Sequence, residues 1–242
     1  MSRVRIFQAL PAIEDTLRIR DIEIVRKIKT VLRMEPGEIL FVFDGEGKEF
    51  SYTVETISKK ELVLQKKGLV RQEKIQPFLL VLAVPLLRDV KMEFILQKTC
   101  ELGVTRIIPY ISARGTVRKA PSAAKSARWM KIVTEAARQS ERLWIPKVDP
   151  IRSVEEVAIE PAELKIVAHQ TGDTRVGLVQ EKKPNTALVI VGPEGDFSEH
   201  ELQLFKENRF HPLSLSQQIL RTETAAIFAV GLIRYLETAY SG

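Results

Sequence analysis

From residue 78 onward, short apolar runs alternate with stretches of helical periodicity. The runs have few polar positions, as expected of strands that are buried on both faces. They are FLLVLAV (78–84), VTRIIPYI (104–111), LKIVAH (164–169), TALVIVG (186–192) and PLSL (212–215). Between or after them lie a helix through Met92 and Thr99, a longer one over about 122–141, and a closing one through Ala225 and Tyr235. This alternation predicts an α/β domain with a mostly parallel sheet covered by helices.

The first 72 residues have a different pattern. A helical face over Ile24–Leu32 ends before Pro36-Gly37, and three candidate strands follow at 39–43, 50–56 and 61–66. Asp44-Gly45-Glu46-Gly47 is a hairpin signal between the first two strands. The charged stretch KKGLVRQEKIQ (66–76) is interpreted as a linker. We therefore expect a small β-rich domain at 1–72 and an α/β domain at 73–242.

The charge of the chain is unevenly distributed. The formal net charge is +6, and residues 73–150 hold 14 basic and 7 acidic side chains, whereas 151–242 hold 9 and 13. Between Arg106 and Lys147 there are ten basic residues and two acidic ones. This local excess favours a polyanionic partner such as nucleic acid, although a solvated basic face is the alternative.

The composition excludes several classes of protein. No apolar run approaches the roughly 18 residues that span a bilayer, and the first residues lack a signal-peptide core, so we expect a cytoplasmic protein without a membrane segment. The single cysteine, Cys100, is expected to be buried and inert. The three histidines, His169, His200 and His211, show no metal-binding spacing, so no metal site is predicted.

The segment TALVIVGPEGDFSEHEL predicts a strand, a rigid loop and a helix. Ser198 and Glu201 have capping-box spacing, and Phe197 and Leu202 can form a hydrophobic staple. Loops of this kind at the carboxyl end of a parallel strand bind ligands. The chain contains no G-x-G-x-x-G and no G-x-x-x-x-G-K-[ST], and the loop offers Glu194, so a nucleoside without phosphates such as S-adenosylmethionine (AdoMet) fits better than a nucleotide. The alternative is that Glu194 only solvates a turn.

A second unusual segment, LSLSQQILRTETAAIFAVGL, leads into the closing helix. Thr222 is expected to cap this helix, and Glu223 lies in its first turn, where a negative charge is favourable. Arg221 gains nothing from the helix dipole, so it is expected either to act in a site or to form a structural salt bridge.

Five segments together resemble the RsmE family of small-subunit ribosomal RNA methyltransferases. They are RMEPGEILFVFDGEG, QKTCELGVTRIIPYISAR, RWMKIVTEAARQSERLWIP, and the pair VGPEGDFSEHE and ILRTETA. The resemblance implies a PUA-like β-barrel domain followed by a SPOUT methyltransferase domain with a carboxyl-terminal trefoil knot. It also implies AdoMet as cofactor, 16S rRNA or the small ribosomal subunit as partner, and a homodimer.

The resemblance further suggests which residues act in the site. The residues expected to bind the cofactor are His169, Gly192, Glu194, Gly195, Leu215, Ser216, Ile219 and Leu220. Those expected to contact RNA are Arg114, Arg128, Lys131 and Arg138, and the candidate catalytic residues are Arg221 and Arg142. The chain departs from the family pattern at Asp196, where a glycine is usual, at Ser216-Gln217-Gln218, where Gly-Pro-Arg is usual, and at Ala113 and Arg138, where glutamate is common.

The resemblance implies methyl transfer from AdoMet to N3 of a uridine in 16S rRNA. The sequence leaves two alternatives open. The chain could methylate another RNA base on the same fold, or it could be a non-catalytic RNA-binding protein of ribosome assembly that has lost its cofactor.

Overall fold

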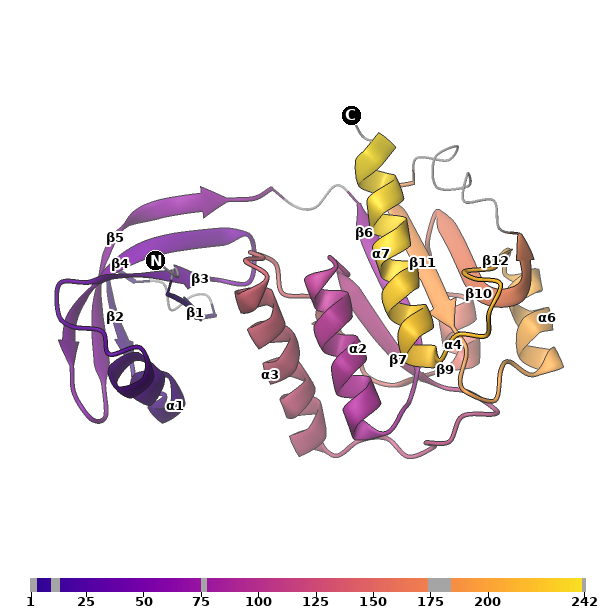
Figure 1. Ribbon diagram of the computed structural model, residues 1–242, viewed down its shortest axis with the longest axis horizontal. Coiled ribbons are helices and arrows are strands. Elements are labelled where there is room, and N and C mark those ends of the chain that lie inside the picture. Colours follow the sequence, from indigo (N-terminus) through magenta and orange to yellow (C-terminus); the bar gives the residue numbers. More distant parts are fainter. Residues whose placement is uncertain (1–3, 10–13, 75–77, 174–183, 241–242) are drawn as a thin grey trace. The chain divides into compact units, whose positions relative to one another are not determined.

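The computed structural model describes residues 4–9, 14–74, 78–173 and 184–240 and divides into two compact units (Figure 1). The first unit comprises Met1–Ile75 together with Ala137–Ile145, and the second comprises Gln76–Ala136 and Pro146–Gly242. The segment 137–145 therefore packs with the first unit although it follows part of the second unit in the sequence.

The first unit contains one five-stranded sheet. Its order is β1-β3-β4-β5-β2, antiparallel except for the parallel pair β1 and β3. The elements are β1 (Arg5–Phe7), β2 (Thr16–Ile19), α1 (Ile22–Arg26), the π-helical turn η1 (Lys27–Val31), β3 (Ile39–Phe43), β4 (Lys48–Ile57) and β5 (Leu62–Gln72). A hydrophobic core that includes Ile28, Leu40 and Tyr52 lies between the sheet and the helical segment.

Local sequence accounts for the predicted hairpin. Asp44 accepts hydrogen bonds from the backbone N–H groups of Glu46 and Lys48, and Gly45 and Gly47 adopt positive φ angles of 77° and 102°. Glycine adopts such angles at little steric cost, which allows β3 and β4 to pair across the turn.

The predicted linker is wrong for most of its length, and its residues 75 and 76 lie outside the described residues. Residues 66–72 belong to β5, where Phe50 pairs with Leu69 and Lys48 with Gln72. This part of the strand was not recognised in the sequence because several of its residues are charged and face solvent. Irregularities in its pairing with β4 also interrupt the alternation of apolar and polar residues.

The second unit contains an all-parallel sheet, as predicted. Its order is β12-β10-β11-β6-β7-β8, with β9 also paired to β7. The strands are β6 (Leu79–Pro85), β7 (Arg106–Ile111), β8 (Lys147–Val148), β9 (Arg152–Ser153), β10 (Leu164–Asp173), β11 (Thr186–Val191) and β12 (His211–Leu213). The helices are α2 (Asp89–Glu101), α3 (Ala123–Gln139, whose last residues belong to the first unit), α4 (Val154–Ala158), α6 (Glu199–Glu207) and α7 (Thr222–Tyr240).

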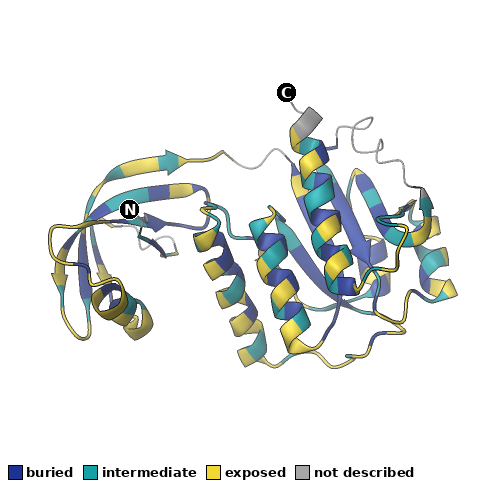
Figure 2. Cartoon of the chain, in the orientation of Figure 1, coloured by how far each residue is buried: buried dark blue, intermediate teal, exposed yellow. Residues whose placement is uncertain are grey.

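The central strands of this sheet are buried on both faces (Figure 2). On one face, Val81 of β6, Ile108 of β7 and Ile190 of β11 belong to one core cluster. This cluster also contains Phe205 of α6 and Val157 of α4. The sequence neighbours of the three strand residues, Leu82, Ile107 and Val189, are equally buried, and α7 packs over β6 and β11 and beside α2. The continuous apolar runs of the sequence follow from this burial on both sides.

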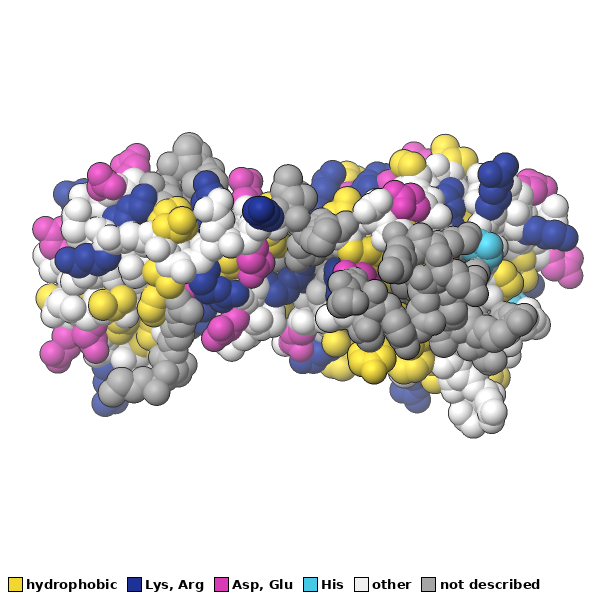
Figure 3. All heavy atoms as spheres, turned by 90° about the horizontal axis from the view of Figure 1, so that it is seen from above, with side chains coloured by type: hydrophobic (Ala, Val, Ile, Leu, Met, Phe, Trp, Pro, Cys, Tyr) yellow, Lys and Arg dark blue, Asp and Glu magenta, His cyan; other side chains and the backbone are white. Residues whose placement is uncertain are grey.

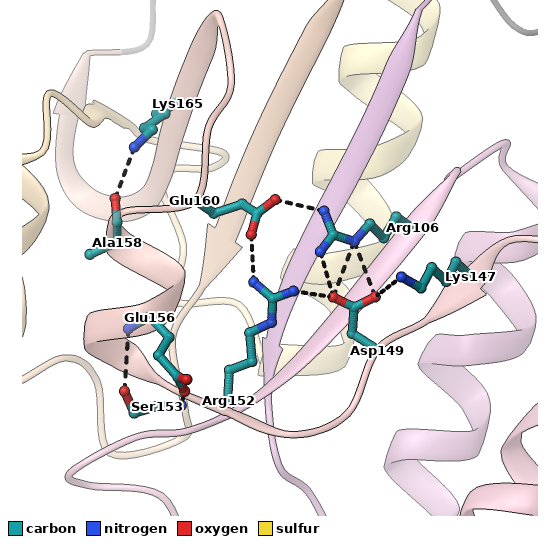
Figure 4. A network of polar contacts seen from close by, with 9 residues as sticks. All are labelled: Arg106, Lys147, Asp149, Arg152, Ser153, Glu156, Ala158, Glu160 and Lys165. Carbon is teal, nitrogen blue, oxygen red and sulfur yellow. Dashed lines mark hydrogen bonds and ion pairs between the residues drawn. The ribbon is translucent and has the colours of Figure 1, made fainter.

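A network of ion pairs stabilises the β7–β9 side of the sheet (Figure 4). Arg106 and Arg152 both bind Asp149 at 2.6 Å, and both also bind Glu160. Burial alone raises the pKa of Asp149, but the hydrogen bond and charge of Arg106 outweigh it and lower that pKa overall. The network joins β7, β9 and the end of α4.

Candidate functional site

A pocket of about 430 Å³ lies between the middle of β10 and the segments that follow β11 and β12. All eight residues predicted to bind a cofactor line it, which places three separate stretches of sequence around one cavity. The lining residues are Ala168, His169, Gln170, Gly192–Asp196, Ser214–Ser216, Gln218–Leu220, Thr222 and Ala225. The charged groups among these described residues are Glu194 and Asp196, with no lysine or arginine, so the pocket disfavours polyanions.

The loop after β11 is fixed at its far end by the predicted cap. Ser198 accepts from the N–H of Glu201, and the Glu201 carboxylate accepts from the N–H of Ser198, which confirms the capping box. Phe197 is buried beneath Gly192, where an added Cβ would meet the phenyl ring at 3.1 Å. The chain therefore has glycine where the loop passes closest to its supporting ring.

The departure at Asp196 has a conformational explanation. Asp196 has φ of 59°, in the left-handed region that glycine adopts freely and that aspartate and asparagine tolerate best among other residues. Its Oδ1 accepts from the N–H of Phe197 at 2.8 Å, and its Oδ2 lies 3.6 Å from Nε2 of His169. The loop can therefore keep a glycine-like turn without a glycine.

The segment between β12 and α7 forms the opposite wall of the pocket. Ser216 accepts from the N–H of Gln218 and Ser214 donates to the carbonyl of Ser216, so hydroxyl groups stabilise the local turn. Gly172 of β10 lies against this wall, and a Cβ there would approach the backbone of Leu213 and Ser214 to 2.6 Å. This close crossing of two chain segments requires a residue without a side chain.

The predicted cap by Thr222 is wrong. Helix α7 begins at Thr222, and the Thr222 hydroxyl donates to the carbonyl of Gly192 at 2.9 Å. The carbonyl of Arg221 instead accepts from the N–H of Ala225 and so begins the helical hydrogen bonds. Thr222 was expected to accept a hydrogen bond from a backbone N–H of the first turn of α7. Its hydroxyl instead connects this helix to the loop after β11, 30 residues earlier in the sequence.

The two candidate catalytic arginines belong to different units. Arg221 is exposed beside the pocket, and among the described residues its guanidinium has no hydrogen-bond or ion-pair partner. Its charge contributes to lowering the pKa of Glu194, after the larger effects of Lys91 and Arg88. Arg142 lies in the first unit, where its carbonyl accepts from Arg5 at 3.2 Å.

The residues predicted to contact RNA are found in three settings. Arg114 donates to the carbonyl of Phe197 at 3.2 Å and so supports the pocket loop. Arg128 is exposed on α3 but pairs with Glu93 of α2 at 2.6 Å, and Lys131 is exposed on the same helix. Arg138, in the first unit, accepts at its carbonyl from Arg5. Their role in RNA binding stays a prediction.

The excess of positive charge between residues 106 and 147 is partly neutralised by acidic residues from outside this segment. Lys125 pairs with Asp89, Arg128 with Glu93, and Arg106 and Lys147 with Asp149. On the face of the first unit seen in Figure 3, basic side chains are likewise interspersed with acidic ones. Counting charges along the sequence therefore overestimated the free positive charge of this segment.

Sequence reasoning missed Lys91. This residue of α2 binds Glu194 of the pocket loop and lies 3.6 Å from Glu223 of α7. The hydrogen bond from Lys91 is the main reason why the pKa of Glu194 lies below its usual value. The signal available in the sequence was weak, because a lysine in the first turn of a helix opposes the helix dipole and is usually a solvated surface residue.

Other expectations concern features outside the pocket. Cys100 is buried, as predicted, and contacts the carbonyl of Val133. Across the described residues, no helix is long and apolar enough to cross a bilayer. In the same part of the chain, no cluster of three or more His, Cys, Asp or Glu side chains is arranged to hold a metal ion.

Comparison with known proteins defines the class to which this chain belongs. Residues 74–234 match the model of an RNA methyltransferase domain, and residues 20–67 match that of an RNA methyltransferase PUA domain. The protein is thus an RNA methyltransferase with an amino-terminal PUA domain, and the expected combination of an α/β methyltransferase domain with a PUA-like domain is confirmed, while the carboxyl-terminal knot of the SPOUT class stays a prediction.

Relatives specify the family. The ribosomal RNA small subunit methyltransferase E of Rickettsia conorii is 31% identical over 88% of this chain and 86% of its own, and that of Bacillus subtilis 29% identical over 88% of both. The solved structure of this methyltransferase from Neisseria gonorrhoeae, bound to S-adenosyl methionine, has a TM-score of 0.82 and 32% identity, covering 95% of each chain. A Legionella pneumophila protein solved with bound SAM has a TM-score of 0.86 and 31% identity, covering 96% of this chain and 97% of its own. The chain belongs to the ribosomal RNA small subunit methyltransferase E family, and the resemblance to RsmE is confirmed.

Proposed function

We propose that this enzyme binds AdoMet in the pocket between β10 and the segments after β11 and β12 and methylates N3 of a uridine in 16S rRNA. The observation that carries the proposal is the convergence of His169, Gly192–Gly195 and Leu215–Leu220 on one cavity. The family to which the chain belongs, and relatives solved with this cofactor, support it.

The chemistry of the pocket suits AdoMet. The cofactor carries a sulfonium and an ammonium group, so a lining that holds Glu194 and Asp196 and no described lysine or arginine favours it, although Lys91 offsets part of the charge of Glu194. Gly192, Gly195 and the 214–220 segment expose backbone groups that can bind a nucleoside. When bound, AdoMet supplies the methyl group.

The protein must also prepare the base. N3 of uracil carries a proton at neutral pH, so methylation requires its removal and stabilisation of the anion that results. Arg221 is suited to this second task, because its guanidinium lies beside the pocket without a partner among the described residues. Arg142 is a second candidate, and Arg114, Arg128, Lys131 and Arg138 are the proposed RNA contacts.

We further propose that the enzyme acts as a homodimer in the cytoplasm, where ribosomal RNA is found, and that domain 1–72 helps to dock this RNA. Exposed apolar side chains on α2 and α7 support the dimer. They are Val90, which is 82% exposed, Phe94, Phe228 and Tyr235. Helices α2 and α7 contact each other, and apolar residues exposed on neighbouring helices are suited to an interface. Phe94→Glu combined with Phe228→Glu should shift sedimentation from dimer to monomer, and a wild-type monomer would refute this part of the proposal.

Two measurements test the activity. Titration calorimetry of the full chain with AdoMet should give one site, and absence of heat at millimolar AdoMet would remove the cofactor assignment. Nucleoside mass spectrometry of 16S rRNA from a deletion strain should show loss of 3-methyluridine that the wild-type gene restores. Loss of a different methylated nucleoside would instead identify another target base.

A further inference from the structure

Lys91 lies between two carboxylates from different parts of the second unit. Its Nζ contacts Glu194 in the loop after β11 and is 3.6 Å from Oε2 of Glu223 in the first turn of α7. One cation thus joins α2, the pocket loop and the start of α7, three elements that are far apart in the sequence.

The other charged residues of α2 have local or lateral partners. Asp89 and Glu93 face α3, where they pair with Lys125 and Arg128, and Lys98 pairs with Glu101 one turn along its own helix. Lys91 differs because its partner Glu194 lines the cofactor pocket. A substitution of Lys91 therefore removes an ion pair of a residue that lines the pocket, whereas a substitution of Lys98 removes an ion pair within α2.

Glu223 depends on this lysine. Its side chain is 15% exposed, and its Oε2 is buried without a hydrogen-bond partner among the described residues. Without Lys91, the cations that still act on Glu194 are Arg88 and Arg221, whose effects on its pKa are smaller, and Glu223 keeps no ion-pair partner among the described residues. Because like charges at short range repel and a buried carboxylate is costly to leave unpaired, the loop would be expected to move away from α7.

We propose that Lys91 is a positioning residue for the cofactor: by holding Glu194 toward Glu223, it keeps the 192–196 loop in the conformation that binds AdoMet. The inference rests on the proposed function, because it assigns Lys91 to the affinity of that same pocket. The hydrogen bond from Thr222 to Gly192 connects the same loop and helix at a second point, so Lys91 adjusts a wall that is already anchored.

The test compares AdoMet binding and kinetics among variants of the full chain. Lys91→Met should weaken AdoMet binding about five- to tenfold, since it removes a partly exposed ion pair and leaves two carboxylates, of which Glu194 is opposed only by the weaker effects of Arg88 and Arg221. The KM for AdoMet should rise while kcat at saturating AdoMet stays within twofold, because the lysine shapes the pocket and does not act on the base. Lys91→Arg should retain most of the affinity.

Two further variants separate positioning from general stability. Lys98→Met removes a lysine of the same 35% exposure from the same helix and should bind AdoMet like the wild type. In Lys91→Met/Glu223→Gln one of the repelling carboxylates is gone, so part of the lost affinity should return.

Unchanged affinity in Lys91→Met, an equal loss in Lys98→Met, or no recovery in the double variant would overturn the proposal. A wild-type protein that fails to bind AdoMet would overturn the proposed function itself, and the inference with it. Binding by the wild type with no effect of Lys91→Met would overturn the inference alone. Thermal unfolding of each variant establishes that it is folded.

Discussion

Replacement of Glu201 by glutamine tests how the pocket loop is anchored. Glu201 is 1% exposed and accepts four hydrogen bonds. Oε1 accepts from the Ser112 hydroxyl at 2.8 Å and the Ala113 N–H at 3.0 Å, and Oε2 accepts from the N–H and hydroxyl of Ser198 at 2.7 and 2.9 Å. The carboxylate thus ties the end of β7 to the start of α6.

The expected loss of stability follows from the number of hydrogen-bond donors that cannot also act as acceptors. The serine hydroxyls can turn to accept from an amide NH₂, but the backbone N–H groups of Ala113 and Ser198 cannot. The single carbonyl oxygen of a glutamine side chain can therefore accept from one of these two N–H groups. The other N–H group then faces the NH₂ group and has no acceptor. Losing a hydrogen bond to a charged acceptor and leaving a buried N–H unpaired should cost about 2 to 3 kcal/mol in free energy of unfolding.

Urea unfolding is the assay. In a Trp144→Phe background the remaining tryptophan is Trp129, which is buried in the second unit and reports on its unfolding. Glu199→Gln is the matched control: it removes an acidic residue from the same first turn without these bonds and should cost less than about 1 kcal/mol.

The pH dependence gives an independent check. Burial raises the pKa of Glu201, but hydrogen bonds from Ser198, Ala113 and Ser112 outweigh it and hold this pKa below its usual value. The stabilisation by Glu201 is therefore complete above the unfolded-state pKa of about 4.3 and is lost as the pH falls through the lower folded-state pKa. The difference between wild type and Glu201→Gln should narrow only below about pH 4. A difference under 1 kcal/mol at pH 7, or one equal to that of Glu199→Gln, would refute the reasoning.

Three further predictions concern the proposed site and RNA binding. Arg221→Ala should lower the single-turnover methylation rate about 100- to 1000-fold at nearly unchanged AdoMet affinity, as expected for a donor to a developing anion, and a wild-type rate would exclude Arg221 from the mechanism. Gly172→Ala should destabilise the second unit by about 1 to 3 kcal/mol and weaken AdoMet binding, because the new Cβ meets backbone at 2.6 Å; calorimetry and urea unfolding measure both. Replacing Arg128 and Lys131 by glutamine should reduce the slope of log K against log salt by up to about 1.8 if both contact phosphates, and an unchanged slope would place the RNA surface elsewhere.

The fold was predictable where one local rule determined the outcome. Strands β6, β7 and β11 are continuous, mostly apolar runs because both faces of the sheet are covered there. The start of α6 was predictable because the side chains of Ser198 and Glu201 bind each other's backbone, an interaction confined to four residues. Rules of this kind need no knowledge of the rest of the chain.

Interactions between distant segments were not predictable in the same way. Arg5 binds Glu49 at 2.5 Å and the carbonyls of Arg138 and Arg142, so it holds segment 137–145 in the first unit. No periodicity in that segment indicates a partner more than 130 residues away. A single boundary near residue 72 therefore did not predict that segment 137–145 belongs to the first unit.

The candidate site shows the same division. The resemblance named eight residues that line the pocket, because loop sequences such as GPEG and ILRTETA are distinctive. It did not name Lys91, whose importance depends on how α2 packs beside α7. Similarly, the acidic partners of Lys125 and Arg128 come from α2, so their neutralisation could not be seen by counting charges along α3.

The residues that depart from the family pattern show how the pocket segments can keep their backbone conformation with different side chains. At Asp196 the requirement is a left-handed backbone, which aspartate can meet and stabilises by accepting from the next N–H. At Ser216-Gln217-Gln218 the chain lacks the usual proline and arginine, yet the bond from the Gln218 N–H to the Ser216 hydroxyl stabilises a turn there by another route. If the cofactor is bound mainly through backbone groups, the conformation of these segments matters more than their side chains. Ser216→Ala, which removes this acceptor, should then weaken AdoMet binding more than Gln218→Ala, which leaves it in place. Equal affinities of the two variants in calorimetry would contradict a role of this turn in AdoMet binding.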